Sequence, residues 1–405
     1  MLFRHYADMS KIDQAMADYA APDRLPRAAY VLTGCVGVIG SNSLVLGPIA
    51  PEVAQSFQAS VPTVMMASSA FGLGTAASAL FLARYIDRLG PRRMLGLAML
   101  LLSMALLASA LSPYVPVLIA AQLIAGVASG VALPAIYASA AAVAQPGREG
   151  RTIGVVLTGW TLSMVAGVAL SAVLADVVHW RAVYVAVALL AALAMLGLSL
   201  MPHRESPASG PAPMPLSALG LPGVKPLLVA CGAFMAAFYG VYGYLGDHLH
   251  HALGEPVSVN GLAALVYGIG FGGSMLFDGV VDRIGARRLM PPAFLLVAAV
   301  YLVLALFADN LLAVLAAIFL WGLANHFGLN ILIMRLTAID PAQRGTIMGL
   351  NSAVTYLAVF LGASGFGPVY TSHGFAACAL LAMGLTLVAA LAGSVPSRTD
   401  RLPQP

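Results

Sequence analysis

The sequence predicts an all-α integral membrane protein with twelve transmembrane helices in two six-helix, pseudo-symmetric halves. Three observations predict this fold class. The chain of 405 residues is 60% hydrophobic and 9% charged, with a mean hydropathy of +0.91, whereas soluble domains are about 45–50% apolar. Its apolar runs are long enough to cross a bilayer, which takes about 20 residues. A charged nonapeptide in the first half of the chain recurs, nearly unchanged, in the second half.

The apolar runs follow one another with short connections, except in the middle of the chain. We place the twelve helices near residues 28–51, 61–82, 94–112, 115–141, 152–175, 182–201, 225–246, 258–277, 289–308, 311–334, 346–369 and 374–394. Residues 202–223 are rich in Pro, Ser and Gly, which is typical of a flexible linker. The expected domains are therefore a cytoplasmic tail, a first bundle, a cytoplasmic linker, a second bundle and another cytoplasmic tail, at 1–27, 28–201, 202–223, 224–396 and 397–405.

Basic residues lie almost entirely on one side of this predicted topology. The polar segment 1–27 has no apolar stretch of the kind found in signal peptides, so we place it in the cytoplasm. All but one of the 20 Lys and Arg then fall in cytoplasmic segments, and only Arg181 lies outside. This positive-inside pattern predicts a multi-pass protein of the cytoplasmic (inner) membrane with both termini in the cytoplasm. It also accounts for the net charge of +4 without a nucleic-acid partner.

The recurring nonapeptide connects the second and third predicted helices of each half. It reads YIDRLGPRR at 85–93 and VVDRIGARR at 280–288, 195 positions later. The same offset places Pro146 on Pro341 and Gly150 on Gly345 in the next cytoplasmic loop. Internal duplication of this kind is how secondary transporters build a binding site between two rocking halves. The halves are therefore expected to be structural duplicates.

The duplicated loop resembles the loop 2–3 signature of the major facilitator superfamily, and the chain is similar to that family's twelve-helix drug/arabinose-efflux type permeases. The matching residues are Asp87, Arg88, Gly90, Arg92, Asp282, Arg283, Gly285 and Arg287. Glycine at these turns permits a tight connection. We expect the aspartates to face helix N-termini and neighbouring arginines, as a cytoplasmic gate that closes and opens. The alternative is that these charges only anchor the loops at the membrane surface.

The predicted helix interiors contain no charged residue near the middle of the membrane, where ionisable side chains are costly and usually functional. A cavity without fixed charge favours neutral or amphipathic substrates. The resemblance implies that helices 1, 4, 7 and 10 line that cavity. The polar and aromatic residues on these helices are the candidates for substrate contact: Asn42, Gln122, Tyr239, Tyr242, Trp321, Asn325, His326 and Asn330. The alternative is that such side chains only form hydrogen bonds between helices.

Two histidine features need separate interpretation. His326 is the only histidine well inside a predicted span, and we expect it to be a neutral hydrogen-bonding residue of the cavity that carries a coupling proton only if water reaches it. Hydrogen bonding to a neighbouring helix is the alternative. The segment DHLHH at 247–251 resembles a metal-binding tract, but it lies at the outer interface without supporting ligands. We therefore predict no metal site.

The sequence thus predicts a secondary active transporter that moves a small neutral or amphipathic organic compound by alternating access, in the outward direction, with protons as the candidate coupling ion. An uptake permease or passive facilitator is one alternative, and a non-transporting membrane receptor is another. The chain contains no nucleotide-binding loop and no nucleophile constellation, so we expect no enzyme activity and no cofactor. The expected partners are the substrate, protons and the lipid bilayer, and the protein is expected to be a monomer.

Overall fold

The structure is a computed structural model that describes residues 25–82, 85–144, 149–200, 214–340 and 343–395. These residues form helices and contain no strand. The first half of the chain contains α2 (Arg27–Phe57), α3 (Val61–Phe81), α4 (Ile86–Leu89), α5 (Pro91–Ala110), α6 (Val115–Val143), α7 (Glu149–Leu162), η2 (Ser163–Val168), α8 (Ala169–Val177) and α9 (Trp180–Ser199). The second half contains η3 (Pro215–Gly220), α10 (Val224–Asp247), η4 (His248–Ala252), α11 (Val257–Gly273), η5 (Ser274–Phe277), α12 (Asp278–Ile284), α13 (Ala286–Leu306), α14 (Leu311–Ile339) and α15 (Arg344–Ser394).

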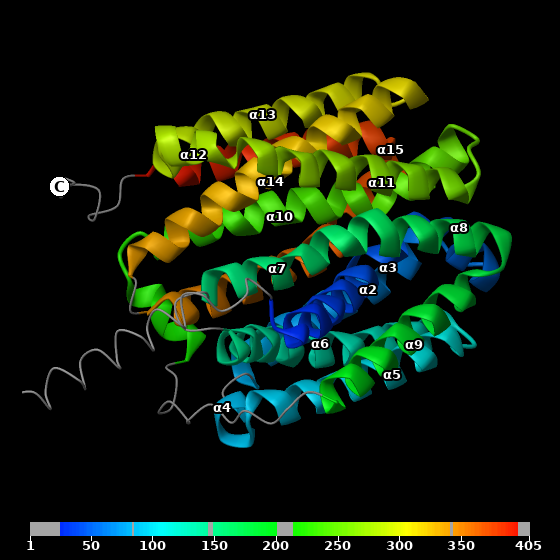
Figure 1. The fold of residues 1–405 in the computed structure, drawn as a ribbon. Coiled ribbons are helices and arrows are strands. Elements are labelled where there is room, and N and C mark those ends of the chain that lie inside the picture. The colour runs from blue at the N-terminus through cyan, green and yellow to red at the C-terminus, as the bar shows by residue number, and fades with distance from the viewer. Residues whose placement is uncertain (1–24, 83–84, 145–148, 201–213, 341–342, 396–405) are drawn as a thin grey trace, which may run out of the picture.

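The helices form two side-by-side groups that follow the order of the sequence. Helices α2 to α9 pack mainly on one another, and so do helices α10 to α15. Figure 1 shows the first group in blue to green and the second in green to red, with α4 and α12 at the same end of the molecule but at its opposite corners. The duplicated loops therefore occupy corresponding places in the two groups.

The number of membrane segments agrees with the sequence prediction once two irregular helices are taken into account. Ten helices among the described residues are long and apolar enough to cross a membrane. Helix α11 has 17 residues and continues into the 3-10 turn η5. Helix α15 combines two arms that meet at Gly374, whose φ of 75° and ψ of −173° are not helical. Counting α11 and both arms gives the predicted twelve segments in the described part of the chain.

Several boundaries differ from those predicted. Helix α2 extends to Phe57 and α14 to Ile339, beyond the apolar runs that the sequence marks. The π-helical segment η4 extends the seventh span to Ala252. His248 therefore lies near the end of a candidate span, whereas His326 lies near the middle of one. A π-helical segment, η2, also interrupts the fifth span.

The end of the predicted flexible linker is ordered. Residues 215–220 form the 3-10 helix η3, which packs against α15 with Ala218 fully buried. Proline at its start fixes φ and favours such a turn. The rest of the predicted linker, up to residue 213, lies outside the described residues.

Close helix packing in each half depends on glycine. A Cβ placed on Gly126 of α6 would lie 2.1 Å from the backbone oxygen of Phe71 in α3, and one on Gly322 of α14 would lie 2.2 Å from that of Tyr267 in α11. No side chain fits at these distances. Without a hydrophobic driving force between helices in lipid, small residues are the usual means by which membrane helices approach closely.

These contacts reveal a second internal duplication. Gly74 and Gly126 contact each other's helices, and their counterparts, 196 positions later, are Gly270 and Gly322. The neighbours match as well, because a Cβ on Gly74 would meet the oxygen of Leu123 at 2.4 Å and one on Gly270 that of Phe319 at 2.2 Å. The offset is one residue longer than that of the charged loops. The α3–α6 and α11–α14 pairs are therefore equivalent.

Arginine side chains cover the C-terminal carbonyl groups of several helices. Arg92 donates to the backbone oxygens of Leu198 and Ser199 at the end of α9, at 2.8 and 3.0 Å. Arg181 does the same at the end of α5, with 2.9 Å bonds to Ala110 and Ser112. The last carbonyls of a helix have no partner within the helix, and its C-terminus carries partial negative charge. These arginines therefore stabilise helix ends.

We predict that Gly126→Ala and Gly322→Ala each lower the stability of the purified protein by about 1–3 kcal/mol, the usual cost of overpacking. The added methyl group must push a backbone carbonyl away in both variants. The measurement is thermal unfolding in detergent. Gly96→Ala and Gly384→Ala are the matched controls, because a Cβ at these positions has no heavy atom within 4 Å. Equal melting temperatures for all four variants would contradict the prediction.

Candidate functional site

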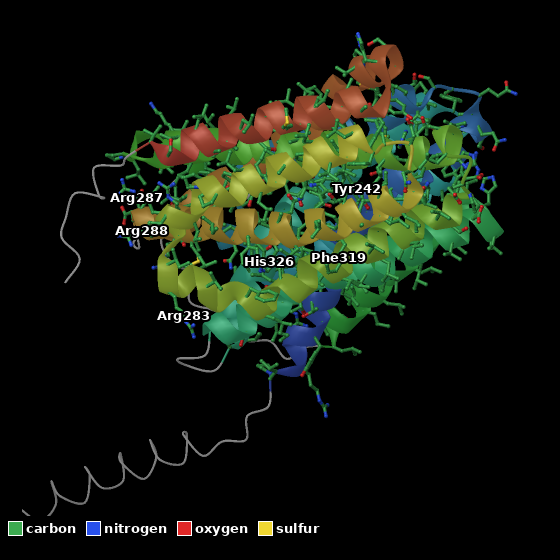
Figure 2. The ribbon with its side chains drawn as sticks, turned by 90° about the horizontal axis from the view of Figure 1, so that it is seen from above. Tyr242, Arg283, Arg287, Arg288, Phe319 and His326 are labelled. Atoms are coloured by element: carbon green, nitrogen blue, oxygen red, sulfur yellow. The ribbon has the colours of Figure 1, made fainter. Side chains whose placement is uncertain are left out.

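The two helix groups meet at one end of the molecule through α2, α10 and α11. We call this the histidine end, because η4 with His248 lies there. The end that carries α4, α12 and the arginines labelled in Figure 2 is the arginine end. At the histidine end, Asn260 of α11 donates a 2.7 Å hydrogen bond to the backbone oxygen of Pro48 in α2. A Cβ on Gly246 of α10 would lie 2.7 Å from the oxygen of Gly47, so the backbones are in direct contact.

Two further helix pairs extend this contact toward the middle of the bundle. Helix α3 packs on α15, where a Cβ on Gly72 would lie 2.7 Å from the oxygen of Tyr356. Helix α11 also packs on α8 and η2, and a Cβ on Gly261 would lie 2.6 Å from the oxygen of Ala169. Gly261 and Ala169 lie between the histidine end and the middle of their helices, whereas Gly72 and Tyr356 lie close to the middle. In this conformation the two halves are therefore joined at the histidine end.

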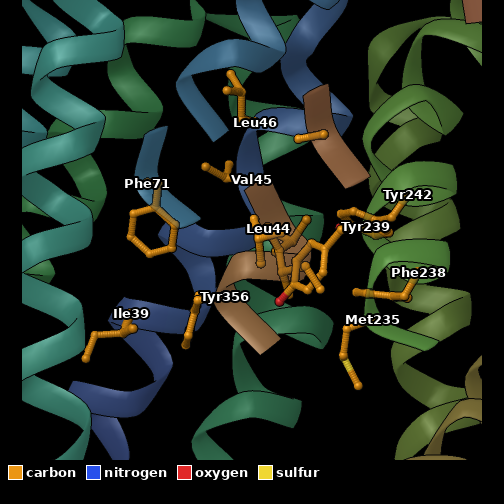
Figure 3. Packing of buried hydrophobic residues seen from close by; sticks show 14 of the residues in the cluster. Ile39, Leu44, Val45, Leu46, Phe71, Met235, Phe238, Tyr239, Tyr242 and Tyr356 are labelled. Carbon is orange, nitrogen blue, oxygen red and sulfur yellow. The ribbon is translucent and has the colours of Figure 1, made fainter. Parts of the chain in front are cut away.

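Aromatic rings gather beside this contact in the second half. Phe238 packs against Tyr239, Tyr242, Tyr267 and Trp321, with ring centroids 4.9 to 5.6 Å apart. Figure 3 shows Phe238, Tyr239 and Tyr242 on the side of α10 that faces α2. Aromatic pairs at such distances contribute more than their buried area alone. Three of the predicted substrate contacts, Tyr239, Tyr242 and Trp321, therefore belong to one cluster.

Asn325 connects this cluster to α11. Its amide nitrogen donates a 3.0 Å hydrogen bond to the hydroxyl of Tyr267, while its Oδ1 is buried and has no partner among the described residues. A buried acceptor without a partner is uncommon and needs an explanation. Among the predicted site residues, Asn325 thus has a buried side-chain oxygen that can accept a hydrogen bond from a ligand.

The predicted pair in the first half is arranged differently. Asn42 of α2 donates to Gln122 Oε1 at 3.1 Å, and Gln122 Nε2 lies 3.3 Å from Asn42 Oδ1 and 3.1 Å from Ser109 Oγ. Both amides are buried. The side chains therefore bind each other and join α2, α5 and α6. This arrangement matches the alternative to substrate contact, namely hydrogen bonding between helices.

His326 and Asn330 lie further along α14 toward the arginine end. The His326 ring is buried and contacts Phe271 edge-to-face, with centroids 5.0 Å apart and planes at 80°. Figure 2 shows His326 inside the bundle, between Tyr242 and the arginines of the arginine end. Asn330 is half-buried. His326 is thus connected to the cluster around Phe238 through Phe271, whose ring stacks on that of Tyr267 with centroids 6.1 Å apart.

The residues predicted to form a gate lie at the arginine end, and the structure describes only some of their side chains. Gly90 and Gly285 have φ of 85° and 92°, a region that favours glycine and suits a tight turn. Arg92 caps α9, and Arg283 and Arg287 are exposed. The side chains of Asp87, Arg88 and Asp282 lie outside the described residues, so the gate stays a prediction.

Sequence reasoning did not identify three buried polar residues on α11 and α15, two helices that pack on the first half. Asn260 forms the cross-half hydrogen bond, and Asn351 Oδ1 and the Tyr356 hydroxyl are buried without a partner among the described residues. They lie on the eighth and eleventh spans, which the resemblance does not place at the cavity. Asparagine is rare in an apolar run, so position alone could have identified Asn260 and Asn351 as candidate site residues.

Comparison with known proteins gives the family. The model of the Major Facilitator Superfamily matches residues 32–363 and 228–401. The chain is 27% identical over 368 residues to an uncharacterized MFS-type transporter, YwfA, of Bacillus subtilis (strain 168), with 89% of each chain covered. It is also 27% identical over 333 residues to a chloramphenicol resistance protein of Streptomyces lividans, with 80% of this chain and 84% of the relative covered.

Solved structures share the fold at lower identity. A D-xylose-proton symporter superposes with a TM-score of 0.74 at 17% identity, over 90% of this chain and 95% of the symporter. The human organic anion transporter MFSD10 (TETRAN) gives a TM-score of 0.70 at 16% identity, over 91% of this chain and all of the other. The predicted resemblance is thereby confirmed, and the chain belongs to the Major Facilitator Superfamily of membrane transporters.

Proposed function

We propose that this protein is a secondary active transporter that moves a small neutral or amphipathic organic compound out of the cytoplasm by alternating access. One observation carries the proposal: the two halves are joined by backbone contacts and by the Asn260–Pro48 hydrogen bond at the histidine end. In the predicted topology that end faces outward. The conformation is then closed to the outside. The outward-open conformation is reached when this contact opens.

The chemistry of the inter-half region supports a substrate without strong charge. The buried residues of the second half include aromatic rings and amides, and its polar atoms without a partner among the described residues include Asn325 Oδ1, Asn351 Oδ1 and the Tyr356 hydroxyl. Such groups orient a ligand by a few hydrogen bonds while rings bury its apolar part. Because Asn42 and Gln122 bind each other in this conformation, they contact substrate only if their mutual bonds break.

The name of one of the relatives supports the outward direction. One bears the printed name chloramphenicol resistance protein, and removal of a toxic compound from the cytoplasm is a direct route to resistance. Coupling to protons is part of the proposal, since a gradient is needed to move a compound against its concentration difference. Asp87 and Asp282 remain the proposed cytoplasmic gate, with the inner membrane as the proposed location and both termini in the cytoplasm.

The proposal predicts that cells overproducing the protein tolerate several-fold more of at least one neutral or amphipathic toxic compound than cells with an empty vector. A panel of such compounds identifies candidates by growth. Inverted membrane vesicles then measure the direction, and an efflux protein accumulates the compound inside these vesicles when a proton gradient is imposed. Accumulation only in right-side-out vesicles would replace efflux by uptake, and no movement in either preparation would remove the transport function.

The contact at the histidine end generates a second prediction. Asn260→Ala removes a hydrogen bond that exists only when this end is closed, so we expect the conformational equilibrium to shift toward the open state by about fivefold, the effect of about 1 kcal/mol. Spin labels at Leu111→Cys and Leu312→Cys, exposed positions at the histidine end, report the change as an increased population of long distances. Ser258→Ala, on the first turn of the same helix, is the control. An unchanged distance distribution in Asn260→Ala would show that the bond does not hold this end closed.

A third prediction separates the two roles considered for His326. Glutamine retains hydrogen bonding but cannot titrate, so His326→Gln should keep proton-driven accumulation and change mainly the KM for substrate, by about threefold to tenfold for one altered hydrogen bond. His373→Gln is the matched control, because this histidine is exposed at the histidine end of α15. Accumulation and counterflow are both measured in proteoliposomes. Loss of accumulation with intact counterflow would instead assign the coupling proton to His326.

A further inference from the structure

A cavity opens at the histidine end, on the side of the inter-half contact that faces away from the arginine end. Its volume is about 770 Å³, which is within the range of ligand sites for drug-sized molecules. The first half contributes the end of α2 and the start of α3, and the second half contributes η4 and the middle of α15. Both halves therefore form its walls.

This cavity contains Asp247, the one buried carboxylate among the described residues. Asp247 is 7% exposed, and its two oxygens accept hydrogen bonds of 2.6 Å from the Tyr370 hydroxyl and from His251 Nδ1. A desolvated carboxylate needs compensation by hydrogen bonds or by positive charge. Tyr370 provides a hydrogen bond but no positive charge, and the His251 side chain is 63% exposed.

No Lys or Arg lines the cavity in the described part of the chain. Its titratable wall residues are Asp247, three histidines and Tyr370. His248 is already engaged, since its Nε2 lies 2.8 Å from the oxygen of Ala308 and its ring stacks on Phe375 at 4.4 Å. His250 Nδ1 lies 2.8 Å from the oxygen of Glu255. The cavity thus presents a carboxylate without a fixed cation.

Aromatic rings lie beside this carboxylate. Tyr370 stacks on Tyr244 with centroids 5.0 Å apart, and Phe375 lines the same wall. An organic ammonium group is attracted both by a carboxylate and by the faces of aromatic rings. Because the exposed His251 can turn away, an incoming ammonium group can take its place on Asp247 at little steric cost.

We propose that the cavity at the histidine end is a second binding site, selective for organic cations that carry an amine and an aromatic or aliphatic body. The ammonium group binds Asp247, and the apolar body lies against Tyr370 and Phe375. This site is distinct from the aromatic cluster around Phe238, which lies on the other side of the Gly47–Gly246 contact. It goes beyond the proposed function, because binding here requires neither transport nor a particular transported compound.

The test compares three ligands of similar shape on the purified full-length protein in detergent. Benzylamine is a cation at neutral pH, benzyl alcohol is neutral and benzoate is an anion. Isothermal titration calorimetry should show saturable binding of benzylamine, at least about tenfold tighter than that of the alcohol and with no benzoate binding. Solubilised protein exposes both ends, so the result is independent of membrane orientation and of transport activity. Equal binding of amine and alcohol, or preferred binding of benzoate, would overturn the proposal.

Variants assign the binding to this carboxylate. Asp247→Asn keeps an acceptor for Tyr370 but removes the charge, so we expect benzylamine affinity to fall at least about tenfold. Asp176→Asn, an exposed aspartate at the end of α8, makes the same chemical change and should leave the affinity within about twofold. Equal affinities in these two variants would exclude Asp247 as the binding group.

Cysteine protection gives the location without altering Asp247. Thr371→Cys introduces a thiol on the cavity wall, and Val178→Cys introduces one at an exposed position outside it. The native cysteines are buried. Benzylamine should slow maleimide labelling of Thr371→Cys about threefold or more and leave Val178→Cys unaffected. Labelling of both at unchanged rates, at a saturating amine concentration, would place the amine elsewhere and refute the site even if Asp247→Asn does not fold.

Discussion

The structure depends on the close approach of helix backbones that glycine makes possible. In a bilayer, apolar side chains gain little by leaving lipid for protein, so helices associate through packing and hydrogen bonds. Within each half, the glycine contacts of α3 with α6 and of α11 with α14 fix two helices at backbone distance. Between the halves, Gly47, Gly72 and Gly246 do the same. The same device therefore serves two purposes, since it makes each half rigid and lets the two halves close on each other.

Duplication of the sequence does not make every equivalent residue play the same part. Arg92 caps the end of α9 through the oxygen of Leu198. The equivalent oxygen in the second half, 195 positions later, is that of Gly393, and it accepts from Arg335 of α14 rather than from Arg287. The physical requirement, a cation at a helix C-terminus, is the same in both halves. In the second half it is met by Arg335, which lies on α14 and not in the duplicated loop.

The sequence predicted the fold class and the helix order because these follow from apolar length and from the distribution of arginine. Boundaries were predicted less well, since a helix such as α14 continues beyond the apolar run while its backbone still gains hydrogen bonds. The π-helical segments have no local signal, and the ordered turn at Pro215–Gly220 has only its first proline as one and also packs against α15. Of the aromatic cluster, Tyr239, Tyr242 and Trp321 were named from the sequence, whereas Phe238 and Tyr267 were not. The pairing of Asn42 with Gln122 was not predicted from the sequence, because the tertiary structure determines which polar groups face each other.

The inter-half contact also determines the free energy that stabilises the conformation closed at the histidine end. Its named components are backbone approaches at glycines and one amide hydrogen bond, from Asn260 to Pro48. A neutral hydrogen bond contributes about 1 kcal/mol net, and dispersion between backbones adds small terms for each atom pair. Such a contact can be broken by the differential binding energy of a small ligand, since a ligand shifts an equilibrium only by its difference in affinity for the two states. A charged, fully desolvated bridge at the same place would cost several kcal/mol to open once formed. Alternating access by a contact that contains no ion pair among the described residues therefore fits a substrate that offers only rings and a few hydrogen bonds.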